Sequence, residues 1–81
     1  SMYVHPDWRR QGWGRRLTQL VMDEARRRGC SRMELWSDTR FDAAHAMYES
    51  LGFRRFGERE IEDSNDSREY GYRLALEPVK A

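Results

Sequence analysis

The sequence predicts an α/β fold whose elements follow the order strand, helix, strand, helix, strand, strand. Three observations support this prediction. Two segments carry apolar residues at helical spacing, a glycine that can end a helix follows each of them, and the segments between and after them alternate apolar and polar residues. A short polar turn joins the last two strands, so we expect a mixed sheet that ends in an antiparallel hairpin.

The chain has 81 residues, which suffices for one domain with a thin core. Hydrophobic residues make up 38% and charged residues 36%, but three Trp, four Tyr and three Phe argue against disorder. We expect a single domain over residues 1–81, with Ser1 as the remainder of a cleaved expression tag and a frayed tail over residues 77–81.

Charge and cysteine content exclude several classes of protein. The net charge of +1 provides no overall attraction to nucleic acid or to an anionic membrane. A single cysteine excludes a disulfide framework and a multi-cysteine metal site. No apolar run approaches the roughly 20 residues of a membrane span, and no secretory leader is visible. We therefore expect a cytoplasmic protein without a metal.

The first half of the chain contains a short strand and a long helix. Residues 2–4 (MYV) form a strand-like run that stops at Pro6, which lacks a backbone N–H. Helical spacing predicts a helix over residues 14–28, which Gly29 ends. One stripe of this helix is expected to be buried, formed by Leu17, Leu20, Val21 and Ala25.

A second strand and a second helix follow. Residues 32–36 predict a strand with Met33 and Leu35 on one face. Thr39 and Asp42 have the spacing of a capping box for the next helix, which Gly52 can end. The buried face of that helix is expected to consist of Ala44, Met47, Tyr48 and Leu51.

The end of the chain predicts the hairpin. Residues 53–61 form a strand weakened or bent at Gly57, and residues 62–67 form a polar turn. The last strand, residues 68–76, alternates apolar residues with polar or small ones. Those apolar residues are Tyr70, Tyr72, Leu74 and Leu76.

Four arginines surround two glycines where the first helix begins, although the positive end of a helix disfavours cations. A bound anion would explain this, because glycines let the backbone approach a ligand and free N–H groups point at it. The candidate groups are the backbone N–H groups of Gln11, Gly12, Trp13, Gly14 and Arg15, with the side chains of Arg9 and Arg15. The alternative is a tight turn beside a solvated basic surface.

Two motifs give the chain a resemblance to a known family. The segment VHPDWRRQGWGRRL resembles the acetyl-coenzyme A signature of the Gcn5-related N-acetyltransferase (GNAT) superfamily, in which V-x-P precedes [QR]-x-x-G-x-[GA]. Val4, Pro6, Arg9, Gly12 and Gly14 match that signature. The segment AAHAMYESLGF resembles the later family motif A-x-x-x-Y-x-x-x-G-F, which Ala44, Tyr48, Gly52 and Phe53 match.

The resemblance covers essentially the whole chain, with two departures. The family often has an asparagine seven residues before the tyrosine, where this chain has Phe41. The first strand, the early helices and the next two strands of the family also have no counterpart here. The chain thus resembles the C-terminal, cofactor-binding half of the fold, a partial GNAT fold.

The resemblance implies a role for individual residues. It implies acetyl transfer from acetyl-CoA to a primary amine of a small molecule or peptide, with the coenzyme A pyrophosphate on the loop amides and Tyr48 as proton donor to the thiolate. Tyr3 and Val4 would pair with the pantetheine arm. Spacing alone favours Tyr48 as a packing aromatic, and the surrounding motif favours the proton donor. Tyr3 and Val4 could alternatively be an ordinary strand edge.

No general base stands out. We expect His5 and His45 to be surface histidines. The glutamates at positions 58, 60 and 62 are expected to be solvated charges. Cys30 is expected to be a small buried apolar group rather than a nucleophile.

Several further readings stay open. The chain could be a truncated acetyltransferase whose function belongs to a longer parent. It could instead pair with itself or with another chain through the exposed edge of its first strand, of which we favour a homodimer, or it could bind coenzyme A without catalysis. A nucleic-acid-binding module could use the arginines with Trp8 and Trp13, but the nearly balanced charge disfavours it.

Overall fold

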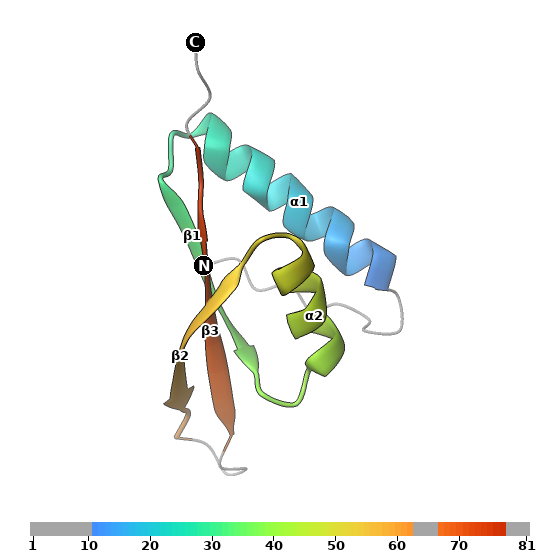
Figure 1. Cartoon of the computed structure of the whole chain (residues 1–81), viewed down its shortest axis with the longest axis vertical. Coiled ribbons are helices and arrows are strands. Elements are labelled where there is room, and N and C mark those ends of the chain that lie inside the picture. Colours follow the sequence, from blue (N-terminus) through green and yellow to red (C-terminus); the bar gives the residue numbers. More distant parts are fainter. Residues whose placement is uncertain (1–10, 63–66, 78–81) are drawn as a thin grey trace.

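A computed structural model describes residues 11–62 and 67–77 of the chain (Figure 1). Its elements in chain order are α1 (Gln11–Arg27), β1 (Arg32–Asp38), α2 (Asp42–Ser50), β2 (Arg54–Glu60) and β3 (Arg68–Ala75). These are the predicted elements in the predicted order. The predicted strand over residues 2–4 and the end of the tail lie outside the described residues.

The described strands form one three-stranded sheet in the order β1-β3-β2. The hairpin of β2 and β3 is antiparallel, as predicted, and β1 also pairs antiparallel with β3. The last strand of the sequence is therefore the central one. A parallel pairing, which a mixed sheet requires, does not occur among the described strands.

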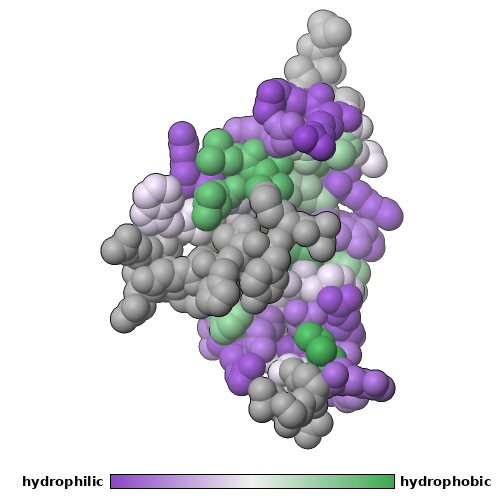
Figure 2. Space-filling view, turned by 180° about the vertical axis from the view of Figure 1, so that it is seen from behind, coloured by the Kyte–Doolittle hydropathy of each residue, from purple (hydrophilic) through white to green (hydrophobic). Residues whose placement is uncertain are grey.

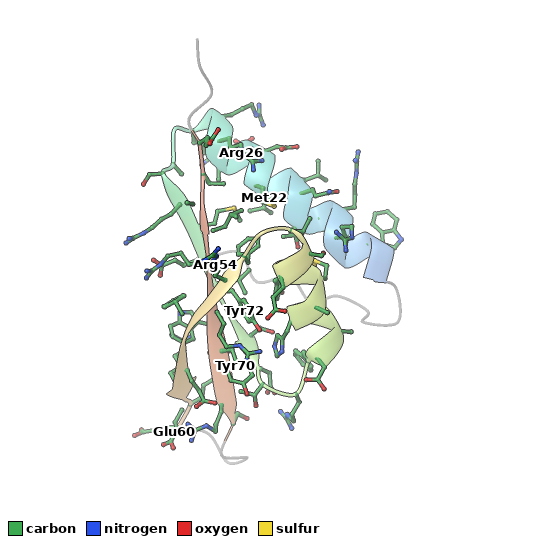
Figure 3. The ribbon with its side chains drawn as sticks, viewed as in Figure 1. Met22, Arg26, Arg54, Glu60, Tyr70 and Tyr72 are labelled. Carbon is green, nitrogen blue, oxygen red and sulfur yellow. The ribbon has the colours of Figure 1, made fainter. Side chains whose placement is uncertain are left out.

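Both helices cover one face of this sheet, and the core lies between the helices and the sheet (Figures 1 and 3). The register places Leu35 opposite Tyr72 and Met33 opposite Leu74, so the predicted inner face of β1 is confirmed. Tyr72 is fully buried and contacts Met22 of α1 and Phe53 in the core cluster.

The predicted buried stripe of α1 is wrong in part. Met22, which was not in that stripe, is the α1 residue that enters the core, whereas Leu17 is 36% exposed and Leu20 is 50% exposed. Apolar side chains accordingly gather on the surface over α1 (Figure 2). Helical spacing predicts which residues share a face, but the contact with β1 decides which face is buried.

The ends of α2 confirm one prediction and correct another. Gly52 has a φ of +99° and ends the helix as predicted. The capping box is wrong, because the residue before α2 is Phe41 and no side chain caps the helix. The preceding turn is instead held by Asp38, whose carboxylate accepts hydrogen bonds from the backbone and side chain of Arg40.

The loops and the hairpin give three further outcomes. The predicted bend at Gly57 is confirmed, because the pairing register shifts between Arg55 and Gly57. Glu58 and Glu60 are exposed, as expected, and both form ion pairs with Arg68. The prediction that Cys30 is buried is wrong. Its side chain is exposed because it follows the α1 terminus in a turn outside the sheet.

Candidate functional site

The site begins at the N-terminus of α1. The helix starts at Gln11, three residues before the predicted start, so Gly12 and Gly14 belong to its first turns rather than to a preceding loop. The first four N–H groups of an α-helix, here those of residues 11–14, have no acceptor within the helix. No acidic residue lies in this first turn, so α1 offers its positive end without a carboxylate of its own.

Gly14 brings the start of α1 against α2. It is buried, and a Cβ built there would lie 3.6 Å from Cε of Met47. The Arg15 guanidinium donates a 2.7 Å hydrogen bond to Oγ of Ser50, which itself donates to the Met47 carbonyl at 2.7 Å. The amide-bearing start of α1 is thereby joined to the half of α2 that carries Tyr48.

The other residues predicted for this site divide into two groups. Trp13 is described and is 61% exposed, and for Gln11 and Gly12 the backbone of α1 is described. Tyr3, Val4 and Arg9 lie outside the described residues. The structure therefore joins Gly14 and Arg15 to α2, and the remaining placements stay predictions.

Tyr48 lies on the side of α2 that faces the core and is half-buried. Its ring centroid lies 5.6 Å from that of Tyr72 and 5.8 Å from that of Phe53. Burial, and then the proximity of Tyr72, raise the pKa of the Tyr48 phenol. Among residues 11–62 and 67–77, no group forms a hydrogen bond with its hydroxyl. Tyr48 thus keeps its proton at neutral pH and is held by ring contacts.

His45, predicted to lie at the surface, is buried, with 3% of it exposed. It lies one turn before Tyr48, and its ring stacks on Tyr72 at a centroid distance of 5.4 Å and an interplanar angle of 27°. A 3.2 Å hydrogen bond joins its Nε2 to Oγ of Ser37. The burial was missed because His45 is polar, although its spacing of three from Tyr48 puts both on one helix face.

Burial lowers the pKa of His45, so its imidazole is neutral at neutral pH. Its Nδ1 is buried and has no hydrogen-bond partner in the described part of the chain. An unpaired buried polar atom is costly, and such atoms commonly mark a special role.

Arg55 is a further residue that sequence reasoning missed. From β2 its guanidinium donates two hydrogen bonds, of 3.1 and 2.8 Å, to the hydroxyl of Tyr72. The same guanidinium lies 3.6 Å from the ring centroid of Tyr70. Figure 3 shows Tyr70 and Tyr72 on the side of β3 that faces α2. Only the pairing of β2 with β3 brings these residues together.

Neither a metal-binding cluster nor a membrane-spanning helix occurs among residues 11–62 and 67–77. The described residues contain no group of three or more His, Cys, Asp or Glu side chains that could hold a metal ion. No helix within them is long and apolar enough to cross a membrane.

The family model and the relatives that match this chain all belong to acetyl- or acyltransferases. The sequence model described as the acetyltransferase (GNAT) family matches residues 1–53. Over 79 residues the chain is 41% identical to the [ribosomal protein bS18]-alanine N-acetyltransferase of Escherichia coli strain K12, covering 94% of this chain and 52% of that protein. Over 53 residues it is 40% identical to the L-amino acid N-acyltransferase MnaT of the same strain, covering 65% of this chain and 31% of the relative.

A solved structure agrees with these relatives. The crystal structure of the ribosomal-protein-S18-alanine N-acetyltransferase from Escherichia coli superposes with a TM-score of 0.75 at 30% identity. The match covers 100% of this chain and 54% of that one. The chain thus spans about half the length of the S18-alanine relative that it matches.

Proposed function

Because this chain belongs to the acetyltransferase (GNAT) family, we propose that it is the coenzyme A-binding half of an N-acetyltransferase. In this proposal the acetyl group passes from acetyl-CoA to a primary amine once the acceptor site of the fold is complete. The observation that carries it is the packing of Gly14 on Met47, which joins the amide-bearing start of α1 to the helix of Tyr48.

The start of α1 fits a diphosphate. The amides of residues 11–14 and the helix dipole favour an anion there, and no carboxylate of the first turn competes for them. The Arg15 side chain, held by Ser50, adds a cation beside this turn. We include Tyr3, Val4 and Arg9 in the binding site on the family resemblance.

Tyr48 is proposed as the proton donor. Acetyl-CoA supplies the thioester; when the amine nitrogen bonds to its carbonyl carbon, the carbon–sulfur bond breaks and the sulfur takes up a proton. The phenol of Tyr48 gives that proton, and the amine loses one to complete the balance. The reference pKa values are about 10 for a phenol and 8.5 for a thiol, a gap that makes proton transfer from phenol to thiolate unfavourable by about 2 kcal/mol. Burial of Tyr48 widens this gap, and desolvation of the thiolate in the same site opposes it.

The acceptor class follows from the names of two relatives. One is an alanine N-acetyltransferase and the other an L-amino acid N-acyltransferase, and the only amine of alanine is its α-amine. We therefore propose an α-amine, either of a free amino acid or of a polypeptide N-terminus.

Calorimetric titration of the chain with acetyl-CoA and with coenzyme A tests the binding proposal. Trp13→Asp and Trp13→Asn form a matched pair at an exposed first-turn position. A carboxylate there favours the helix dipole by about 0.3–1 kcal/mol, so the Asp variant stays folded. It repels a diphosphate nearby, and we expect affinity to fall about tenfold or more relative to the Asn variant. Equal affinities for the two variants would contradict a diphosphate at this turn.

Acetylation of an alanine-ended peptide and of free L-amino acids then tests transfer. Saturable binding without transfer to any amine would mean that the chain does not transfer on its own, which both the binding half of a longer acetyltransferase and a nonenzymatic coenzyme A binder predict. Salt-sensitive binding of a mixed oligonucleotide without competition from coenzyme A would favour the nucleic-acid reading.

We also propose that the chain forms a homodimer through the predicted first strand and that it is cytoplasmic. Sedimentation at high protein concentration tests the first, and a monomer would contradict it. Cell fractionation tests the second.

A further inference from the structure

His45 and Tyr48 lie on the same face of α2, one helical turn apart, and both rings contact the same residue of the sheet. The centroid of His45 is 5.4 Å from that of Tyr72, and the centroid of Tyr48 is 5.6 Å from it. Tyr72 is fully buried. A change in the stacking of His45 on Tyr72 therefore also changes the contact between Tyr72 and the ring of Tyr48.

His45 also ties α2 directly to two of the described strands and, through Tyr72, to the third. Its Nε2 is hydrogen-bonded to Ser37 of β1, and its ring contacts Tyr70 and Tyr72 of β3, the first in an edge arrangement at 5.4 Å. Tyr72 in turn accepts two hydrogen bonds from Arg55 of β2. Ser37 is 7% exposed, so its bond to His45 lies in the interior. A buried hydrogen bond resists sliding of the helix more strongly than apolar contacts do, because breaking it leaves both groups unpaired.

Tyr48 itself lacks such an anchor. Its ring is held by contacts with Tyr72 and Phe53, and in the described part of the chain its hydroxyl has no hydrogen-bond partner. The position of the phenol thus depends on where α2 sits on the sheet. The polar tie nearest to Tyr48 along the inner face of α2 is that of His45.

We propose that His45 is a positioning residue for Tyr48, which fixes α2 on the sheet through its hydrogen bond to Ser37 and its stacking on Tyr72. This inference rests on the proposed role of Tyr48 as proton donor. A proton donor must lie within about 3 Å of the atom that it protonates, and a misplacement of about 1 Å can cost two orders of magnitude in rate. Neither motif of the family resemblance includes position 45.

The first experiment reads the placement of Tyr48 directly and needs no catalysis. The phenol pKa and ring resonances of Tyr48 are measured by nuclear magnetic resonance in the 81-residue chain with labelled tyrosine, assigned with Tyr48→Phe. We expect Ser37→Ala and His45→Leu to move the pKa of Tyr48 toward its ordinary value of about 10 and to shift its ring resonances. His45→Gln, which can keep a hydrogen bond to Ser37, is expected to change them less.

A matched control separates positioning from general loss of stability. Leu76 is 5% exposed directly after β3, and Leu76→Val weakens the core without touching the His45 contacts. At an equal loss of melting temperature, this variant is expected to leave the Tyr48 signals unchanged. Unchanged Tyr48 signals in folded Ser37→Ala and His45→Leu would overturn the proposal. If His45→Leu does not fold, Ser37→Ala and His45→Gln decide the question.

The second experiment measures acetyl transfer by the same variants. We expect kcat to fall about tenfold in Ser37→Ala, with KM for acetyl-CoA unchanged, because the start of α1 is not altered. A rise of about tenfold in KM for acetyl-CoA with kcat unchanged would overturn the positioning role. A wild-type chain that binds no acetyl-CoA would contradict the proposed function, and the resonance data would still decide the role of His45.

Discussion

Two glycines face each other across β2 and β3, and they predict opposite effects for the same substitution. Gly57 pairs with Gly71 in the register, on the sheet face away from the helices. A Cβ at Gly71 would lie 2.8 Å from Cζ of Phe56 and 3.0 Å from Cη2 of Trp36. A Cβ at Gly57 would lie 3.7 Å from the same Trp36 atom, an ordinary contact. Gly71→Ala should therefore destabilise the sheet, and Gly57→Ala should not.

The magnitude follows from the contacts that Phe56 must give up. Its ring is 39% exposed and can swing away, which breaks the edge contact with Trp36 at 5.3 Å, worth about 0.5–1.5 kcal/mol. It also loses the Arg73 guanidinium, 4.2 Å from its ring centroid and worth about 0.5–1 kcal/mol. Replacing glycine by alanine recovers about 0.4–1 kcal/mol through the unfolded chain. Gly71→Ala should thus cost about 1 kcal/mol, and Gly57→Ala should gain about 0.5 kcal/mol.

Urea unfolding followed by circular dichroism measures this contrast. The expected difference of about 1.5 kcal/mol between the two variants corresponds to about 6–12 °C in melting temperature for a domain of this size. In a Phe56→Ala background the two closest contacts of the new Cβ are gone and only Trp36 at 3.0 Å remains, so Gly71→Ala should destabilise the chain less. Equal stability of the two single variants would refute the placement of the Phe56 ring over Gly71.

Three further predictions concern the site. Tyr48→Phe should lower kcat for acetyl transfer by about 10²- to 10⁴-fold with little change in KM for acetyl-CoA, and unaltered steady-state rates would remove Tyr48 as proton donor. Gly14→Ala places its Cβ at ordinary contact distance from Met47, so thermal melts of the ligand-free chain should show a gain of up to about 1 kcal/mol; a loss of stability would contradict the packing of the two helices. The pKa of His45 is depressed in the folded chain, so the unfolded chain binds the proton more readily, and stability should be complete above about pH 6.5 and fall as the pH drops below it. Urea melts between pH 7 and 5 should show this loss, and a Ser37→Ala, His45→Phe double variant that keeps the full slope would assign it elsewhere.

The elements themselves could be predicted because their signals are local. A helix repeats every 3.6 residues and a strand every two, so the apolar pattern of a short segment reports its own conformation. Gly52 ends α2 because a positive φ is a property of one residue. The two family motifs are likewise local strings, and the prediction that Gly14 and Tyr48 belong to the candidate site rests on them.

Burial and side-chain partners could not be predicted in the same way. Cys30 is exposed and His45 is buried, both against expectation, because a residue's type says less than the position of its element on the sheet. Likewise, Leu17 and Leu20 share a helix face that the described sheet does not cover.

The sequence by itself determined the α/β class, the order of the elements, their approximate bounds and the two motifs that predict acetyl-CoA chemistry. The tertiary structure alone decided that β3 is central, that Arg55 reaches Tyr72, and that His45 joins α2 to the sheet one turn before Tyr48. The physical reason is the range of the interactions. Backbone periodicity and glycine conformation act within a few residues, whereas burial depends on contacts between residues far apart in the chain.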